Sequence, residues 1–268
     1  MPAATPLHLL DGRPWQDSAW VDPLSLLGCY TSFVVDSSGR VADLNAHLDR
    51  LERDTAVLLG SPVDRALVVR RAVEHVAVAG GGPVRLRVAV LAQTPPLQPQ
   101  DVRSLHVATS SRPVPHAPTG PWTVLTSPHV RALPAVKSVD PFLQLHLKRQ
   151  ARLAGADDAL LARGEDLLEG TTWGLVAVGP DGVVAPEQDV LPSLGVARVL
   201  ARAQRLGFAV ERRPVRTAEL AGLGLLLAVN AVVTPVALAR VDEQVVDVDV
   251  GLLDALSRDE GAPGEQLR

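Results

Sequence analysis

The stretch Asn45-Ala46-His47-Leu48-Asp49-Arg50-Leu51 lies within residues 44–59, where apolar residues recur at helical spacing. Its leucines share one face, so the segment predicts an amphipathic helix that carries the polar residues of the stretch. Residues 28–35 before it favour a strand. Residues 63–79 after it favour a second helix, followed by a strand at 84–90. The order of these elements predicts an α/β lobe.

Only two of the 26 basic residues are lysines, Lys137 and Lys148. In a chain so rich in arginine, a retained lysine points to a task that a guanidinium cannot perform. The clearest such task is a Schiff base with a carbonyl group, because an arginine stays protonated and is a poor nucleophile. Lys137 ends the apolar pair Ala135-Val136, where a buried reactive amine is expected. Lys148 stands in a polar run and is predicted to be a solvated helix residue.

The composition excludes several classes of protein. The 268 residues are 47% hydrophobic, which is enough for a sizeable core. A net charge of -4 and a pI near 6.0 give no electrostatic reason to expect nucleic acid. Residues 1–10 lack a signal-peptide pattern, polar residues and a proline interrupt the apolar segment 223–239, and Cys29 is the single cysteine. The histidines lack metal-site spacing. We therefore expect a cytoplasmic protein without a membrane span, a disulfide or a metal.

A proline-rich stretch at residues 110–121 divides the chain. We predict a mixed α+β fold with an N-terminal lobe at residues 1–112, a linker at 113–121 and a C-terminal lobe at 122–268. The expected elements of the second lobe are strands at 122–125, 130–136, 158–162, 175–178 and 183–184, a helix that Asp140-Pro141 starts and that runs to about Leu153, and a helix that follows residues 191–195 and runs through Arg205.

Four groups of residues follow one another in an order and spacing typical of one family. They are H-L-x-R-L at residues 47–51, Lys137, Glu169-Gly170 after residues 155–161, and Leu191-Pro192-Ser193-Leu194-Gly195. With these residues the chain resembles the class IV aminotransferases, which include branched-chain and D-amino acid aminotransferases and aminodeoxychorismate lyase. The resemblance covers most of the chain. It implies the two-lobed architecture of fold type IV pyridoxal 5′-phosphate (PLP) enzymes, with a barrel-like second lobe that carries the cofactor lysine.

The resemblance implies a role for each of these groups. Lys137 would form the Schiff base with PLP and then transfer the substrate's proton. Glu169 would pair with the pyridine nitrogen and keep it protonated. Arg50 would bind the cofactor phosphate, with the backbone amides of Leu194 and Gly195 at a helix start completing the phosphate site.

The substrate side of the site is also implied by the resemblance. Arg85 and Arg87 lie on one face of a predicted strand, where family members place an arginine for the substrate carboxylate. Tyr30, which follows Cys29, could supply a hydroxyl toward the substrate. The alternatives are a solvated strand edge for the arginines and core packing for Tyr30. The implied assembly is a homodimer, and the implied partner is a small amino acid or keto acid.

The chain departs from the family pattern at four places, all of them polar positions of the cofactor site. Where the family has an asparagine–tyrosine pair after the lysine, this chain has Asp140-Pro141, and where the family signature L-P-G-I-T-R has threonine and arginine, it has Gly195 and Val196. Gly174 replaces the family's asparagine after the glutamate, and Val229 replaces its threonine before a late asparagine. These departures leave the partner of the cofactor's O3′ oxygen unassigned.

The sequence therefore leaves two classes of function open. The first is a PLP-dependent enzyme that acts on an amino acid or amino-bearing carboxylic acid, by transamination or by elimination of the aminodeoxychorismate lyase kind. The second is a relative that keeps the fold as a dimeric binding protein, without catalysis or without PLP. In the second case Lys137 would reach solvent, Glu169 would lie in a surface turn, and Arg50 would pair with carboxylates on its own helix.

Overall fold

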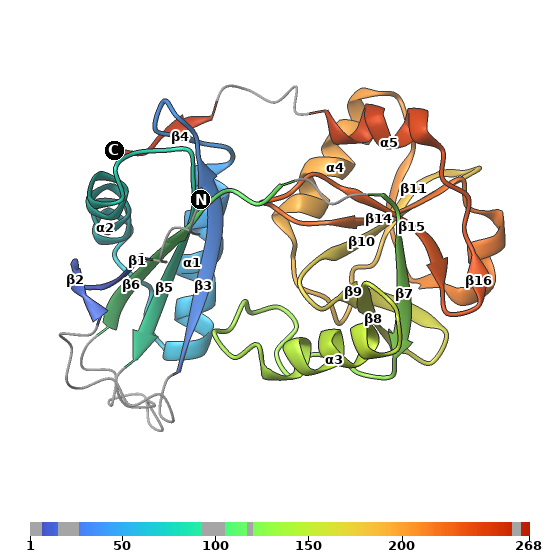
Figure 1. Cartoon of the computed structure of the whole chain (residues 1–268), viewed down its shortest axis with the longest axis horizontal. Coiled ribbons are helices and arrows are strands. Elements are labelled where there is room, and N and C mark those ends of the chain that lie inside the picture. Colours follow the sequence, from blue (N-terminus) through green and yellow to red (C-terminus); the bar gives the residue numbers. More distant parts are fainter. Residues whose placement is uncertain (1–6, 16–26, 93–104, 117–119, 259–263) are drawn as a thin grey trace. The chain divides into compact units, whose positions relative to one another are not determined.

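The computed structural model describes residues 7–15, 27–92, 105–116, 120–258 and 264–268. The chain divides into two compact units. Unit 1 comprises Met1–Pro115, Val136–Asp140 and Glu260–Arg268, and unit 2 comprises His116–Ala135 and Pro141–Asp259. The ribbon of Figure 1 shows helices and strands in both units, which confirms the predicted mixed class.

Unit 1 is built on one sheet of seven strands in the order β17-β4-β3-β5-β6-β1-β2. Its centre is the long antiparallel pair β3–β5, joined to β6 by a full antiparallel ladder. The strands are β1 (Leu7–Leu10), β2 (Arg13–Pro14), β3 (Leu27–Val35), β4 (Arg40–Val41), β5 (Val84–Ala92), β6 (Leu105–Arg112) and β17 (Glu265–Gln266). The predicted strands at 28–35 and 84–90 are thus confirmed, whereas β1 and β6 were not predicted.

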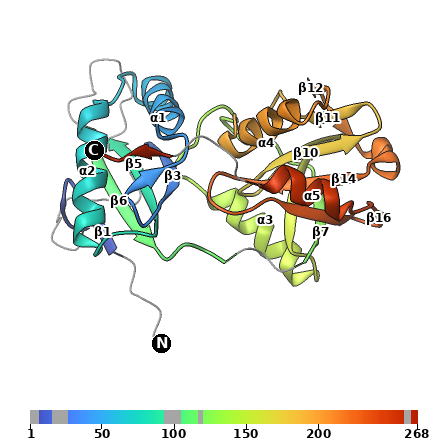
Figure 2. The ribbon, with the colours of Figure 1, turned by 90° about the horizontal axis from the view of Figure 1, so that it is seen from above.

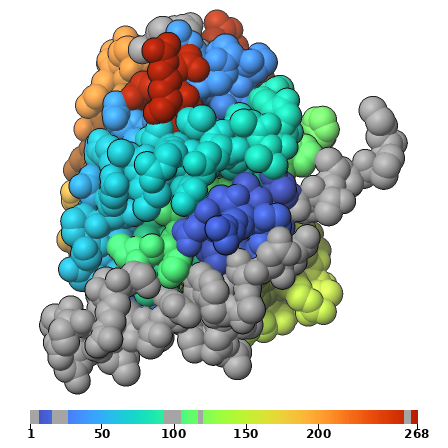
Figure 3. Space-filling model, turned by 90° about the vertical axis from the view of Figure 1, so that its left-hand side faces the viewer, coloured from blue at the N-terminus to red at the C-terminus, as the bar shows by residue number. Residues whose placement is uncertain are grey.

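Two helices, α1 (Leu44–Leu59) and α2 (Arg65–Val78), cover one face of this sheet. Leucines of α1 pack against alternate residues of β3 and β5, including Phe33 and Leu86. Because side chains alternate across a strand, the residues between them face the opposite side of the sheet. Figure 2 shows both helices, and in the space-filling view of Figure 3 α2 crosses the surface of unit 1 as a teal band beside the blue β1–β2 segment.

The lysine segment Val136–Asp140 belongs to unit 1, although the sequence analysis assigned it to the second lobe. It pairs with the first half of β3: the amide of Tyr30 donates to the carbonyl of Lys137, and that of Val139 to the carbonyl of Gly28, both at 2.9 Å. The physical reason is an open strand edge, since β4 pairs with β3 only at Val35. The segment satisfies backbone groups that would otherwise be left on this edge.

Unit 2 is a sheet that closes on itself. Six strands follow one another in the order β10-β14-β15-β7-β8-β9, and the pairing of Glu169 on β9 with Gly174 on β10 completes the ring. Their bounds are β7 (Trp122–Ser127), β8 (Asp158–Arg163), β9 (Asp166–Gly170), β10 (Gly174–Gly179), β14 (Leu225–Val229) and β15 (Val236–Val241). An apolar cluster from these strands, with Trp173, forms the core of a small barrel.

The remaining elements of unit 2 surround this ring. Helix α4 (Leu194–Arg205) packs on β10 and β14, and helix α3 (Phe142–Leu153) packs on β8. The peripheral elements are β11 (Gly182–Ala185), β12 (Val210–Arg212), β13 (Val215–Arg216), the 3-10 helix η3 (Thr217–Gly222), β16 (Gln244–Val245) and α5 (Val250–Ser257). Within the described ranges no helix has the length and apolar character to cross a membrane.

One sequence prediction in this region is wrong, because residues 130–136 form no strand. The helix predicted to start at Asp140-Pro141 is confirmed as α3, which begins at Phe142 with Pro141 at the N-cap position. The predicted linker is described at 113–116, 120 and 121, none of which lies in a helix or strand, while 117–119 lie outside the described residues.

Lys148 also differs from its prediction as a solvated residue. Its Nζ lies 2.6 Å from Oδ2 of Asp158, a carboxylate with 0% exposed surface. Asp158 also accepts hydrogen bonds from Thr171 Oγ1 at 2.7 Å, Trp173 Nε1 at 3.1 Å and the amide of Ala159 at 2.8 Å. A carboxylate taken out of water requires such partners, so this second retained lysine has a structural role in attaching α3 to β8.

Replacing Lys148 by Met is expected to destabilise the protein by about 2–4 kcal/mol, because it leaves Asp158 buried with hydrogen bonds but without its counter-charge. Arg149→Met, one residue later on the exposed side of α3, is the matched control and should change stability by less than about 0.5 kcal/mol. Urea unfolding of both variants measures the difference. Equal stabilities would show that the ion pair contributes nothing.

Candidate active site

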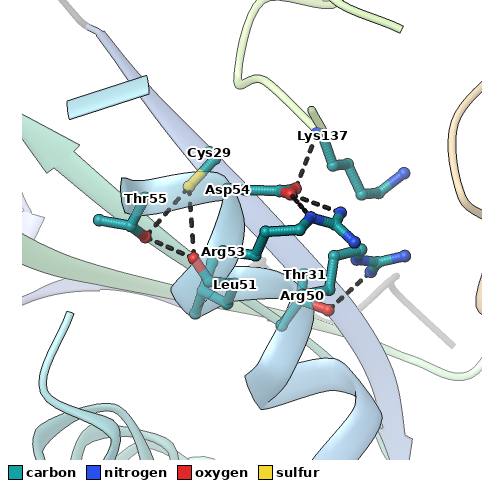
Figure 4. A network of polar contacts seen from close by, with 8 residues as sticks. All are labelled: Cys29, Thr31, Arg50, Leu51, Arg53, Asp54, Thr55 and Lys137. Carbon is teal, nitrogen blue, oxygen red and sulfur yellow. Dashed lines mark hydrogen bonds and ion pairs between the residues drawn. The ribbon is translucent and has the colours of Figure 1, made fainter. Parts of the chain in front are cut away.

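Lys137 is held at its backbone and half-buried at its side chain. Its amide donates to Asp54 Oδ2 at 2.9 Å, and its neighbour Val136 is buried in the core of unit 1. The Nζ atom lies 4.8 Å from the centre of the Tyr30 ring. Figure 4 shows the side chain of Lys137 extending from this anchor on the same side as those of Arg53 and Arg50. The backbone of Lys137 is therefore fixed, and its amine lies beside the Tyr30 ring.

Asp54 is the buried anion of this group, with a side chain only 1% exposed. Besides the amide of Lys137 it accepts from Arg53, with Nη2 at 2.6 Å and Nε at 3.1 Å from Oδ1. Asp54 thus joins helix α1 to the lysine segment. Asp54 was not predicted as a site residue, because an aspartate within an amphipathic helix carries no signal of a contact 83 residues away.

Arg50 is 5% exposed and makes one hydrogen bond, from Nη2 to Thr31 Oγ1 at 2.8 Å. Its Nε is buried without a partner, and no carboxylate of the described residues forms an ion pair with it. Burial lowers the pKa of Arg50, and the nearby charge of Asp54 opposes that shift. The alternative of a helix-face ion pair does not hold, because Asp49 and Glu52 are both bound by Arg65.

The other face of the sheet gathers further cations around Tyr30. Arg87 lies with its Cζ atom 4.5 Å from the centre of the Tyr30 ring. Arg85, two residues away on the same face, is the register partner of Arg112 on β6. Burial lowers the pKa of Arg85, and the charges of Arg87 and Arg112 lower it further. Within the described part of the chain no carboxylate pairs with these three arginines, so this face attracts anions.

Cys29 precedes Tyr30 but points to the opposite, α1-facing side of β3. Its Sγ lies 3.4 Å from Thr55 Oγ1 and 4.0 Å from the carbonyl of Leu51. Burial raises the pKa of its thiol to about 11. A thiol with this pKa is protonated at neutral pH, which excludes it as a nucleophile.

Glu169 lies on β9 of unit 2, at the place where the barrel closes, and is only 4% exposed. Its Oε2 accepts the amide of Leu191 at 3.2 Å, and its Oε1 lies 3.7 Å from Nη1 of Arg131. The surface-turn alternative is therefore wrong. Arg131 was not predicted as a partner, since it lies in an irregular loop without periodic signal.

Helix α4 begins directly after Leu191. Ser193 is its N-cap, and the Ser193 side chain accepts from the amide of Val196. The next amide, that of Ala197, donates to the carbonyl of Ser193. The amides of Leu194 and Gly195 thus remain as the two donors at the helix start that have no partner in the described structure. Amides of this kind, with the positive end of a helix dipole, bind phosphate groups.

Two of the departures from the family pattern are coupled in space. A Cβ atom at Gly174 would lie 2.5 Å from Cγ2 of Val196, so the small residue on β10 makes room for the apolar residue on α4. A Cβ atom at Gly195 would lie 2.5 Å from the backbone of Asn230. The absence of a side chain at Gly195 therefore allows the start of α4 to lie against the backbone that follows β14.

The comparisons with known proteins identify the family and the fold of the chain. The family model "Amino-transferase class IV" matches residues 28–239. The chain belongs to the class IV aminotransferase family. Members of this family are PLP-dependent aminotransferases and lyases. Among curated protein sequences, none matches the chain significantly.

Solved structures of class IV aminotransferases share the fold. A branched-chain aminotransferase from Thermoproteus uzoniensis, solved with norvaline, is 19% identical over 94% of this chain and 93% of its own, with a TM-score of 0.80. A putative 4-amino-4-deoxychorismate lyase from Legionella pneumophila is 17% identical over 85% and 88%, with a TM-score of 0.76. A hypothetical aminotransferase from Mycobacterium tuberculosis, in a PLP-bound form, is 16% identical over 96% and 100%, with a TM-score of 0.76.

Gly195→Ala is expected to destabilise the protein by about 1–3 kcal/mol, because the added methyl group meets the backbone of Asn230 rather than a flexible side chain. Gly222→Ala is the control, since nothing lies within 4 Å of the Cβ position there. Thermal unfolding of the two variants gives the comparison. A Gly195→Ala protein as stable as the control would contradict the close approach.

Proposed function

We propose that this chain binds PLP through Lys137 and Arg50 and acts on an amino acid or amino-bearing carboxylic acid, by transamination or elimination. The observation that carries the proposal is the state of Arg50: a buried guanidinium with an unpartnered Nε and no ion pair among the described residues. A buried charge without a counter-charge is costly, and a phosphate group supplies two oxygens in the geometry that a guanidinium fork matches.

The residues present fit the cofactor. Lys137 has an anchored backbone and a half-buried side chain that extends from this anchor, which suits covalent attachment through Nζ. The buried carboxylate of Glu169 suits pairing with the pyridine nitrogen. The two amides at the start of α4 suit the phosphate. When bound, PLP supplies an electron sink for the charge that develops at the substrate's Cα.

In this proposal the chain's own residues bind and orient the cofactor and substrate and transfer protons. The amine of Lys137 accepts and returns the proton of the substrate's Cα, because it is the one titratable group tethered at the point of covalent attachment. Glu169 would lie against the pyridine nitrogen and stabilise a proton there. Its hydrogen bond from the amide of Leu191 fixes one carboxylate oxygen and so orients the other.

The arginines around Tyr30 support an anionic substrate. Arg87 contacts the same ring as the Nζ of Lys137, so a molecule whose amine meets Lys137 could place a carboxylate at Arg87. Arg85 and Arg112 add positive charge on that face. The substrate class is therefore an amino compound with at least one carboxylate. The resemblance and composition further lead us to propose a homodimer located in the cytoplasm.

Borohydride reduction of the PLP-saturated protein is expected to place the pyridoxyl adduct on Lys137. Lys148 serves as an internal control, because its amine is committed to Asp158. Peptide mass spectrometry identifies the modified residue. An adduct on Lys148 would overturn the assignment, and a protein without any adduct would support the non-catalytic alternative.

Glu169→Gln is expected to lower kcat by roughly 10- to 150-fold, the effect of losing one charge-assisted hydrogen bond of about 1.5–3 kcal/mol. The affinity for PLP should change much less, because the amide keeps the shape and the acceptor for Leu191. Glu165→Gln, at an exposed position four residues earlier, is the control. Steady-state kinetics and PLP titration separate the two quantities, and an unchanged kcat would refute the role of Glu169.

A further inference from the structure

A buried polar group behind Arg50 has no role in the function proposed above. It consists of Thr31 on β3 and His47 on α1, with 0% and 1% exposed surface. Thr31 Oγ1 lies 2.7 Å from His47 Nδ1 and accepts from Nη2 of Arg50 at 2.8 Å. The hydroxyl thus stands between the imidazole and the guanidinium. All three side chains are at least nine-tenths buried, so solvent does not substitute for any of these contacts.

The direction of one of these two hydrogen bonds follows from chemistry. A guanidinium has donors only, so Arg50 donates to Thr31 and cannot accept the hydroxyl hydrogen. His47 Nδ1 lies at hydrogen-bond distance from the same hydroxyl, which can donate to it or accept from it through its second lone pair. With either tautomer the Thr31 hydroxyl bonds to the imidazole and to the guanidinium at once.

The imidazole of His47 also contacts the ring of an aromatic side chain. The ring of Phe33 meets it edge-to-face, with centroids 5.3 Å apart and planes at 64°. Phe33 belongs to the hydrophobic core of unit 1. His47 and Arg50 are three residues apart on α1 and so share a helix face. The core thereby fixes the ring, the ring fixes the hydroxyl, and the hydroxyl fixes one end of the guanidinium.

We propose that His47 is a positioning residue for phosphate binding: through the Thr31 hydroxyl it holds Nη2 of Arg50 and so fixes the direction of the guanidinium fork that binds the anion. This inference rests on the proposed function, in which Arg50 binds the phosphate of PLP. Without the relay, the guanidinium keeps its charge but loses a fixed direction. Binding of the phosphate then weakens, because ordering the side chain is left to the binding event.

The experiment compares PLP with pyridoxal, which lacks the phosphate, as ligands of the apoprotein. Dissociation constants come from equilibrium absorbance titration, without any assay of turnover. Thr31→Val keeps the shape of the side chain and removes the hydroxyl. His47→Phe removes the hydrogen-bond partner of the hydroxyl. We expect each to raise the Kd for PLP by roughly 5- to 10-fold and to leave the Kd for pyridoxal within about 2-fold.

Conservative variants distinguish positioning from general packing. Thr31→Ser restores the hydroxyl, and His47→Asn places an acceptor oxygen near the position of Nδ1, so both should return the Kd for PLP to within about 2-fold of the original. If Thr31→Val or His47→Phe weakens PLP and pyridoxal equally, the role is structural and the inference is wrong. Should the His47 variants fail to fold, the Val and Ser variants at position 31 decide the question alone.

Arg50→Gln separates this inference from the function on which it rests. A large loss of PLP affinity with unchanged pyridoxal affinity is expected from the phosphate role of Arg50. If Arg50→Gln shows that loss and Thr31→Val does not, the relay is refuted while the proposed function stands. If Arg50→Gln leaves both affinities unchanged, the phosphate role itself is wrong, and the inference is overturned with it.

Discussion

The pairing of the lysine segment with the open edge of β3 is the interaction on which the candidate site depends. Two backbone hydrogen bonds join residues 137 and 139 to residues 28 and 30, and Asp54 holds the amide of Lys137. This arrangement brings a residue 107 positions later in the chain against Tyr30. Backbone ladders are insensitive to side-chain identity, so a site built in this way keeps its lysine in place while the residues around it change.

Charge is distributed unevenly in unit 1. Asp54 is satisfied by Arg53 and by a backbone amide, whereas Arg50, Arg85 and Arg87 have no carboxylate partner within the described ranges. Buried or crowded cations of this kind lower stability in the absence of an anion. They become favourable when a ligand brings phosphate or carboxylate groups. The same logic explains why the second lysine, Lys148, lies elsewhere: it neutralises Asp158 in unit 2.

At the positions that depart from the family pattern, polar side chains are absent and neighbouring elements pack closely together. Gly174 and Val196 fit each other, and Gly195 allows the start of α4 to approach the backbone of Asn230. In both cases polar side chains are replaced by close contacts between elements. The donors that remain at this helix start are backbone amides, which point along the helix axis whatever the side chain is. The phosphate site that we propose at these amides therefore does not require side-chain hydroxyls.

The sequence by itself determined the local elements and the family. Helical spacing predicted α1 closely, strand patterns predicted β3, β5, β8 and β10, and the order of the motifs around His47, Lys137 and Glu169 predicted the class. These signals are local, since they depend on periods of two or 3.6 residues and on short motifs. Only the tertiary structure decided that residues 136–140 join unit 1, that Asp54 holds Lys137, that Lys148 pairs with Asp158, and that Thr31 links His47 to Arg50. Each of these depends on contacts between segments distant in the chain, and an open strand edge or a buried charge leaves no periodic trace in the sequence.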